Sequence, residues 1–332
     1  MLEQILAPLT FEWLSAFIDP RKRVFWGYLV SAFIVAVAWL MLANRRSLRA
    51  TVHVVFDRAA WWSPSARADY ILMAANSALM TLLSPRLLAK ATVAYWIFEG
   101  LHRLFDGRPL FWASAADWQI AVLFTAFLFL LDDFARYWVH RWLHTAPVFW
   151  SFHRVHHSAT VLNPITVFRT HPVEAVLFSA RGAITQGVAI ALFFFLYGDK
   201  VTLVSILGAN VFTFVFNALG SNLRHSPVSL PFWRPIERVL MSPAQHQIHH
   251  SAAPQHHNRN YGVALSLWDW MFGTFSYSEK HQRLVYGLAG RGGHVAQHRL
   301  SHLYFEPFKH AAKCLPFRRR TVYMAMSLRR PI

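Results

Sequence analysis

The chain has 332 residues, of which 55% are hydrophobic and 15% are charged, and its formal net charge is +17. Soluble domains have roughly 25% charged residues, so the excess of apolar side chains must face either a very large core or lipid. Basic residues gather beside anionic lipid headgroups, and no nucleic-acid motif accompanies the charge. We therefore expect a membrane protein without a nucleic-acid partner.

The N-terminal part contains one predicted spanning helix and two shorter apolar segments. Residues 24–43 are uncharged and about as long as a helix that crosses ~30 Å of hydrocarbon. Residues 70–84 and 87–98 are apolar but shorter, and we expect them to dip into the membrane or to lie at its interface. Residues 1–117 are therefore predicted to form an N-terminal membrane and interfacial region.

Residues 118–280 are predicted to form a histidine-rich domain that includes a membrane hairpin. The hairpin, residues 173–219, has two long apolar arms joined by Gly198-Asp199-Lys200. A chain that crosses the membrane and returns brings the histidines before and after the hairpin to the same membrane face.

A fourth spanning helix is expected from the apolar residues 120–131. From Arg224 onward the chain carries 15 Lys or Arg against 4 Asp or Glu, which is typical of cytoplasmic segments. Residues 281–332 are accordingly predicted to be a basic cytosolic tail. The predicted fold class is all-α: a multi-pass membrane protein with about four spanning helices plus interfacial helices, and a cytosolic histidine-rich helical cap.

The histidines are unevenly distributed, with five of the nineteen in residues 140–157 and five more in residues 246–257. Three sets at helical spacing lie within these windows, and we call them the histidine boxes. Their members are His140 and His144; His153, His156 and His157; and His246, His249 and His250. Spacings of three and four residues place the members of each box on one helical face, where they can share a metal ion.

Asp133 and Tyr137 extend the face of the first box towards the start of its helix. A carboxylate at this position could orient a metal ligand from behind, or it could be an ordinary charge at a helix end. Thr145 with Pro147 predicts the start of the helix that carries the second box.

The third box follows the clearest helix start in the chain. Ser242 can cap the helix, Pro243 suits the first helical position, and Gln245 completes a capping box. The histidines of this box then lie in the first turns of the helix, where the helix dipole disfavours a protonated imidazole. Neutral imidazole is the form that binds metal.

Eight imidazoles packed together need a common partner. They would repel one another if protonated, and they would be costly to desolvate without partners; a metal removes both problems. Eight ligands exceed the four of one tetrahedral zinc ion and suit two ions with positions left open for oxygen. Imidazole binds iron, zinc and copper alike, so the ligands alone do not name the metal.

A series of ordered motifs runs from about residue 133 to residue 274. They are Tyr137-Trp138-x-His140-Arg141, His153-x-x-His156-His157-Ser158, Arg169-x-His171-Pro172-x-Glu174, Ser242-Pro243-x-x-His246-x-x-His249-His250-Ser251, Asn260-Tyr261-Gly262 and Trp268-Asp269-x-x-Phe272-Gly273-Thr274. This series resembles the fatty acid hydroxylase/sterol desaturase superfamily of membrane histidine-box di-iron oxygenases. The order of the motifs is much more specific than any single box.

The resemblance implies a centre of two iron ions under the cytosolic cap, with zinc able to replace iron in purified protein. It implies O2 as a co-substrate and hydroxylation of a C–H bond in a membrane lipid acyl chain, a fatty acid or a sterol-like substrate. A lipid desaturase with the same centre is the alternative outcome. Residues 118–280 would then be the catalytic domain.

The resemblance also adds metal ligands to the eight histidines of the boxes, namely His225 after the hairpin and His257 before Asn260-Tyr261-Gly262, with His256 as the alternative to His257. His171 either supplies a further ligand or is a structural contact for Glu174. The residues expected to support the ligands without necessarily binding metal are Asp133, Tyr137, His171, Glu174, Asn222 and Asp269.

Electrons are expected from an external donor, a reductase with a cytochrome b5-like or ferredoxin-like carrier, and the sequence leaves the oligomeric state open. The boxes are expected on the cytoplasmic side of a bacterial inner membrane, or of the endoplasmic reticulum in a eukaryote. Two functions of another class are a membrane zinc hydrolase with Glu174 as its acid or base and a metal-binding or transport protein. A transporter would place its ligands within the spanning segments, whereas the boxes lie at segment ends.

Overall fold

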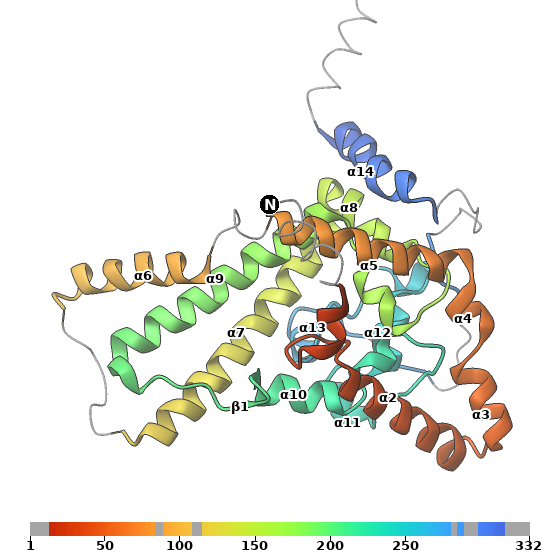
Figure 1. Ribbon diagram of the computed structural model, residues 1–332, viewed down its shortest axis with the longest axis horizontal. Coiled ribbons are helices and arrows are strands. Elements are labelled where there is room, and N and C mark those ends of the chain that lie inside the picture. The colour runs from red at the N-terminus through yellow and green to blue at the C-terminus, as the bar shows by residue number, and fades with distance from the viewer. Residues whose placement is uncertain (1–12, 84–88, 108–114, 280–283, 289–297, 316–332) are drawn as a thin grey trace, which may run out of the picture.

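The structure is a computed structural model that describes residues 13–83, 89–107, 115–279, 284–288 and 298–315 (Figure 1). The described part of the chain is almost entirely helical or irregular. Within it, β1 (Ser205–Ile206) pairs with β2 (Ala209–Asn210) in a short antiparallel hairpin. The predicted all-α fold class is confirmed.

The N-terminal region folds into helices of unequal length. They are α2 (Trp26–Ala38), its π-helical continuation η1 (Trp39–Ala43), α3 (Leu48–Val55), α4 (Arg58–Trp62), α5 (Pro64–Leu83) and α6 (Lys90–Leu104). Side chains cap three of the starts. Ser47 accepts a hydrogen bond from the N–H of Ala50, Asp57 accepts one from the N–H of Ala59, and Ser63 accepts one from the N–H of Ala66. Such caps satisfy backbone donors that a helix start leaves unpaired.

Three helices of the described chain are long and apolar enough to cross a membrane. They are Trp26–Ala43, α7 (Asp117–Thr145), and α9 (Pro172–Tyr197) with its continuation η4 (Gly198–Lys200). These three correspond to the spans predicted at residues 24–43 and 120–131 and to the first arm of the hairpin, and the first begins two residues later than predicted. The protein is therefore a helical membrane protein.

The prediction of a second spanning arm in the hairpin is wrong. After η4 the chain runs without helix to the β1–β2 turn, and α10 (Val211–Ala218) has only eight residues. The Thr125 hydroxyl of α7 accepts from the N–H of Val204 at 2.9 Å, and the Asn210 amide donates to the Thr125 carbonyl at 3.0 Å. Non-helical backbone is tolerated in a membrane region where protein groups satisfy it in this way, and hydropathy alone does not reveal such partners.

The remaining helices are short and connect the long ones to the histidines. They are α8 (Pro147–His157), η3 (Pro164–Phe168), η5 (Ser221–Arg224), α11 (Arg234–Glu237), α12 (Pro243–His249), η6 (Pro254–His256), α13 (Leu267–Met271) and α14 (Leu300–Cys314). Although the tail was predicted only as a basic surface segment, α14 packs on α8 and α5, with Leu303 buried against Val155 and Leu72. Residues 281–283, 289–297 and 316–332 of that tail lie outside the described residues.

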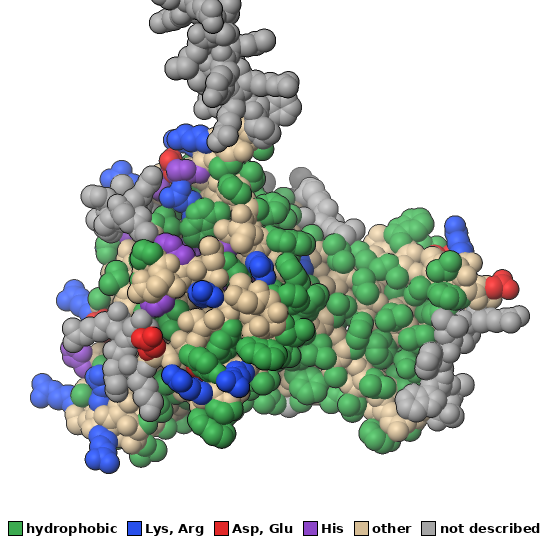
Figure 2. All heavy atoms as spheres, turned by 180° about the vertical axis from the view of Figure 1, so that it is seen from behind, with side chains coloured by type: hydrophobic (Ala, Val, Ile, Leu, Met, Phe, Trp, Pro, Cys, Tyr) green, Lys and Arg blue, Asp and Glu red, His purple; other side chains and the backbone are tan. Residues whose placement is uncertain are grey.

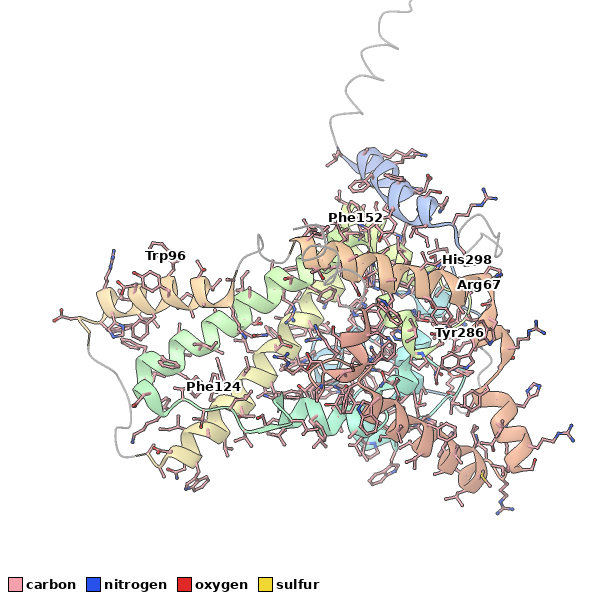
Figure 3. All side chains as sticks on the ribbon, viewed as in Figure 1. Arg67, Trp96, Phe124, Phe152, Tyr286 and His298 are labelled. Carbon is pink, nitrogen blue, oxygen red and sulfur yellow. The ribbon has the colours of Figure 1, made fainter. Side chains whose placement is uncertain are left out.

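The molecular surface divides into two parts. Apolar side chains cover the part that carries α6, α7 and α9, at the right of Figure 2, whereas most basic side chains and the visible histidines lie on the other part. Trp96 on the outer side of α6 is 65% exposed (Figure 3). Large exposed apolar patches mark contact surfaces, and here lipid chains suit the composition. Beneath this surface, Phe124 of α7 packs against Phe193 of α9.

Two glycines of α9 differ in how closely another helix approaches them. A methyl group at Gly187 would lie 2.7 Å from the Val93 side chain of α6, whereas nothing lies within 4 Å of the corresponding position at Gly182. We predict that Gly187→Ala lowers the apparent melting temperature in detergent, since overpacking typically costs about 1–3 kcal/mol. Gly182→Ala is the matched control and should not lower it. Equal melting temperatures for both variants would contradict the close packing of α6 on α9.

Candidate metal centre

The histidine boxes lie at the ends of helices that converge in one region. The first box occupies the last two turns of α7, the second the last turns of α8, and the third occupies α12. The predicted capping box of α12 is confirmed, with Ser242 accepting from the N–H of Gln245 and the Gln245 side chain accepting from the N–H of Ser242. For α8 the cap is Ala146 rather than Thr145, whose hydroxyl instead donates to the Arg141 carbonyl.

The structure brings nine of the ten histidines predicted as ligands together. They form two groups, and in each the potential ligand atoms all lie within 4.8 Å of one another. The first histidine group is His140, His144, His153, His157 and His249, and the second histidine group is His156, His225, His246 and His250. The groups adjoin, since the rings of His157 and His250 stack with centroids 4.6 Å apart. Each group combines histidines from different helices.

His257 lies outside both groups, contrary to the sequence prediction. The turn formed by η6 carries its side chain to the surface, where it is exposed and lines a pocket of about 350 Å³. His256, its neighbour, is buried but also lies outside the two groups. The pocket itself reaches both groups, because His249 and His250 are part of its wall.

Bare ring nitrogens inside the first group fit a metal ion. The Nε2 atoms of His144, His153, His157 and His249 are buried and have no hydrogen-bond partner among the described residues. An unpaired buried polar atom costs about 1–3 kcal/mol, and four of them directed into one place make a shared cation the simplest partner.

Three ring nitrogens of the second group lie at the corners of a small triangle. Nε2 of His225 lies 2.9 Å from Nε2 of His250 and 3.1 Å from Nε2 of His246, and the latter two are 3.2 Å apart. Such separations suit nitrogens that share one ion at ~2.0–2.1 Å. The residues present therefore fit a metal in both groups.

Backbone carbonyls set the tautomers of several of these histidines. Nδ1 of His140 lies 2.7 Å from the Tyr261 carbonyl, and Nδ1 of His249 lies 2.8 Å from the Arg259 carbonyl. A carbonyl only accepts, so Nδ1 carries the proton and Nε2 keeps its lone pair. This is the arrangement usually found behind metal-binding histidines.

Burial keeps the clustered imidazoles neutral. It lowers the pKa of His156 to about 3, helped by repulsion from His153. Burial together with the neighbouring histidines also lowers the pKa of His157 and of His250 well below the usual value of 6.5. The rings are thus held in the metal-binding form at neutral pH.

The motif Arg169-x-His171-Pro172-x-Glu174 supports the site through three different contacts. Glu174 accepts from Nδ1 of His153 at 3.0 Å, and both side chains are almost fully buried. His171 lies outside both histidine groups and interacts with Glu174 only electrostatically, while its Nδ1 caps α9 by accepting from the N–H of Val173. Its Nε2 contacts the carbonyl of Tyr304 on α14 at 3.1 Å.

Arg169 is the member of this motif whose role the sequence did not predict. Its carbonyl accepts from Nδ1 of His156 at 3.2 Å, while its guanidinium pairs at 2.8 Å with Asp69 on α5. Both side chains of the pair are fully buried. The guanidinium also contacts Nδ1 of His298 at 2.9 Å, next to the start of α14 (Figure 3). The sequence motif drew attention to Arg169. No pattern around Asp69 predicted that it would pair with a residue 100 positions away.

The two predicted aspartates act on the loop that follows the third box rather than on a histidine. Asp133 accepts from the N–H groups of Ala264 and Leu265 at 2.9 and 3.0 Å. Asp269 accepts from the N–H groups of Tyr261 and Gly262, each at 2.7 Å. Asp133 is thus not an ordinary helix-end charge; with Asp269 it fixes the loop whose Tyr261 carbonyl holds His140.

Tyr137 and Asn222 also support the histidine groups only through contacts with other residues. The Tyr137 hydroxyl lies 3.0 Å from the Thr274 hydroxyl, which itself donates to Asp269. The Asn222 amide donates to the Arg23 carbonyl at 2.9 Å and ties the segment before α2 to η5, next to His225. All six predicted supporting residues are placed, but only Glu174 touches a clustered histidine through its side chain.

The fold and the site define a class: a helical membrane protein with two adjoining histidine groups at the ends of its helices. The fatty acid hydroxylase family model matches residues 125–274. These residues contain all three boxes and both groups, so the part of the chain that carries the site is similar to the fatty acid hydroxylase family. No solved structure matches the chain.

Relatives among known proteins act in more than one way on lipids. Alkylglycerol monooxygenase from Danio rerio is 28% identical over 230 residues, which cover 68% of this chain and 44% of the relative. Delta(7)-sterol 5(6)-desaturase erg3B from Aspergillus fumigatus is 25% identical over 77% of this chain and 70% of its own length. Ornithine lipid hydroxylase OlsE from Rhizobium tropici is 27% identical over 49% of this chain and 44% of its own length. The chain thus spans less than half of the alkylglycerol monooxygenase.

The two groups predict the metal content. Protein purified without chelator should carry about two metal ions per chain by elemental analysis. His249→Ala removes one of the bare nitrogens of the first group and should lower the content substantially. His257→Ala is the matched control, since this nearby exposed histidine lies outside both groups, and it should leave the content unchanged. An equal loss in both variants would return His257 to the set of ligands.

The contact between Glu174 and His153 gives a second prediction. Glu174→Ala should weaken metal binding about 10- to 100-fold, the usual effect of removing a group that orients a ligand, measured by competition with a chelator. His171→Asn should bind metal like the wild type, because asparagine is also a good helix cap. A comparable loss in His171→Asn would show that His171 does more than cap α9.

Proposed function

We propose that the protein is an O2-dependent membrane lipid hydroxylase with two histidine-bound iron ions. The observation that carries this proposal is the pair of adjoining histidine groups with bare, buried ring nitrogens. An all-imidazole donor set suits iron, zinc or copper. The oxidative reactions in the names of the relatives favour iron among these.

Iron bound in the two groups would supply the activation of O2 for attack on an unactivated C–H bond, which no side chain can supply. The overall reaction consumes one O2, two electrons and two protons. One oxygen atom enters the lipid as a hydroxyl group and the other leaves as water. The two electrons require an external donor, and we propose a reductase that acts through a cytochrome b5-like or ferredoxin-like carrier.

The protein's own side chains hold the ligands in place and keep water away. Tyr261, Arg169 and Arg259 direct histidine rings through their carbonyls, and Glu174 directs His153 through its carboxylate. Burial of the rings removes competing water, which strengthens electrostatic interactions within the site. The 350 Å³ pocket walled in part by His144, His157, His249 and His250 gives a substrate or O2 a way to approach both groups.

Desaturation is the second candidate, and a specific observation favours it. The sterol desaturase aligns over more of this chain and more of its own length than the alkylglycerol monooxygenase does, 77% and 70% against 68% and 44%. The monooxygenase has the higher identity, 28% against 25%. We prefer hydroxylation because of this higher identity to a monooxygenase, and because a bacterial relative is named a lipid hydroxylase.

Functions of another class have less support. A zinc hydrolase would need an acid or base facing the metal, whereas Glu174 is bonded to His153 on the side of the ring opposite the bare Nε2. A transporter would need ligands inside the spanning segments, whereas the boxes lie at the end of α7 and on α8 and α12. We further propose that the chain is multi-pass, with its histidine groups on the cytoplasmic side of a bacterial inner membrane, or of the endoplasmic reticulum in a eukaryote.

Lipid mass spectrometry with and without expression of the protein tests the function. We expect a lipid species heavier by one oxygen atom that depends on O2 and a reductant. A species lighter by two hydrogens would instead establish the desaturase. His156→Ala should abolish the product while the protein still inserts into the membrane, and His257→Ala should retain it. An unchanged lipid profile under aerobic, reducing conditions would refute both oxidative functions for the lipids present.

A further inference from the structure

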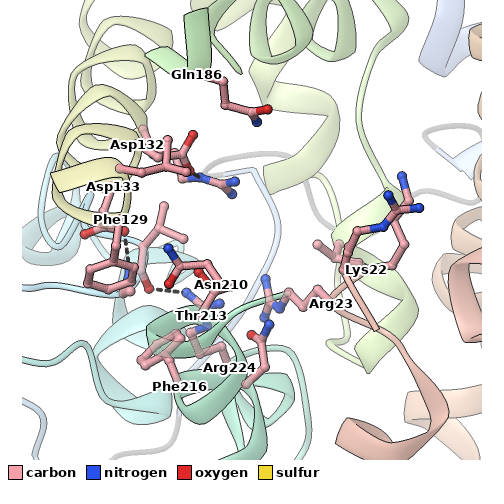
Figure 4. Close-up of a pocket in the computed structure, with 17 residues that line it drawn as sticks. Lys22, Arg23, Phe129, Asp132, Asp133, Gln186, Asn210, Thr213, Phe216 and Arg224 are labelled. Atoms are coloured by element: carbon pink, nitrogen blue, oxygen red, sulfur yellow. Dashed lines mark hydrogen bonds and ion pairs between the residues drawn. The ribbon is translucent and has the colours of Figure 1, made fainter. Parts of the chain in front are cut away.

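A second cavity lies on the side of the second histidine group that faces the long helices. It has a volume of about 390 Å³ and is formed by the segment before α2 together with α7, α9 and α10 (Figure 4). Leu128, Phe129 and Phe216 give it an apolar wall, while Arg23 and Arg224 give it a basic one. No histidine of either group lines it, so it is distinct from the pocket that reaches both groups.

Two guanidinium groups at this cavity converge on one backbone oxygen. Arg23 donates to the Ser221 carbonyl at 3.2 Å, and Arg224 donates to the same carbonyl at 3.1 Å. Among the described residues neither arginine forms an ion pair with a carboxylate. The Arg224 side chain is almost fully buried, and Nε of Arg23 is a buried donor that has no hydrogen-bond partner within the described part of the chain.

The acidic groups at the cavity are already engaged. Asp132 forms ion pairs of 2.7 Å with both Arg136 and Arg181. Asp133 also lines the cavity, but its two oxygens are bonded to the loop after the third box. Asp133 keeps its negative charge, because neutral N–H donors do not cancel it, and it attracts Arg224. Five basic side chains nevertheless line the cavity against these two carboxylates, so the wall that carries Arg23 and Arg224 in Figure 4 has an excess of positive charge.

Two like charges held close together with little water repel one another, and each loses hydration energy. An anion between them would offset both costs. Guanidinium groups bind the oxygens of phosphates and carboxylates through paired N–H donors. The apolar wall beside the arginines requires that such an anion bring hydrocarbon with it, which a lipid does and a free ion does not.

We propose that Arg23 and Arg224 bind the phosphate or carboxylate head of a lipid whose chain lies along Leu128, Phe129 and Phe216. That this lipid is the substrate rests on the proposed function, whereas the anion site itself does not. Arg23 also contacts Nδ1 of His225 at 3.4 Å, so the bound head lies one side chain away from the second histidine group.

Binding to the full-length, delipidated protein in neutral detergent tests the site, with isothermal titration calorimetry as the readout. The probes are 1-oleoyl lysophosphatidate, monoolein with the same acyl chain but no phosphate, and inorganic phosphate. We expect the lysophosphatidate to bind at least tenfold more tightly than either other probe. Equal affinity for monoolein would overturn the anion site, and equal affinity for inorganic phosphate would overturn its assignment to a lipid.

Variants then assign the binding to the two arginines. Arg23→Gln and Arg224→Gln should each weaken lysophosphatidate binding at least tenfold and leave monoolein binding unchanged. Arg224→Lys, which keeps the charge but loses the paired donors, should bind with intermediate affinity. The matched control is Arg21→Gln, since Arg21 lines the same cavity but is exposed and paired with Asp19; its binding should change less than twofold. Wild-type affinity in both glutamine variants would overturn the proposal.

The binding measurement is independent of turnover and of the metal. Selective lysophosphatidate binding in a protein that oxidises no lipid would refute the proposed function and leave the anion site standing. Lipid oxidation by a protein without that selectivity would refute the anion site alone. Metal analysis of each variant shows whether a substitution beside His225 has disturbed the second histidine group. If a glutamine variant has lost metal, the binding affinity of Arg224→Lys decides whether the arginine binds the anion.

Discussion

The structure depends on one constraint: nine imidazole rings, eight of them buried and that of His144 half-buried, lie side by side, and their bare nitrogens cannot satisfy one another. A neutral imidazole has one donor and one acceptor, so each ring needs a group behind it that fixes its proton. It also needs a positive partner in front. Most of the polar contacts around the groups serve the first need, and a metal in each group would serve the second.

The groups behind the rings are themselves held by distant parts of the chain. The carbonyl behind His156 belongs to Arg169, whose guanidinium is anchored to Asp69 on α5. The carbonyl behind His140 belongs to Tyr261, in a loop fixed by the carboxylates of α7 and α13. Gly262 is needed in that loop because a side chain there would collide with Asp269. The motifs around the boxes therefore encode the support of the ligands as much as the ligands themselves.

The long helices connect the apolar part of the surface to the histidine groups. The long helices α7 and α9 supply an apolar exterior, and α7 ends in the first box. Asp132, Arg23 and Arg224 line one cavity between these helices and α10, and Arg181 pairs with Asp132 there. A lipid head bound at Arg23 and Arg224, as proposed above, would lie beside His225 of the second histidine group.

The sequence by itself determined the local features. Spacings of three and four residues placed His140 with His144 and assembled the other two boxes, because helical periodicity depends only on neighbouring residues. Ser242, Pro243 and Gln245 likewise defined the start of α12, and hydropathy located the three long helices. The tertiary structure decided how the boxes combine into the two groups. His156 lies in the second group with His225, apart from His153 and His157 of its own box. His249 lies in the first group with the histidines of α7, apart from His246 and His250. It also placed His257 at the surface, shortened the second hairpin arm and paired Asp69 with Arg169. These outcomes depend on contacts between residues far apart in the chain, and no local pattern specifies such contacts.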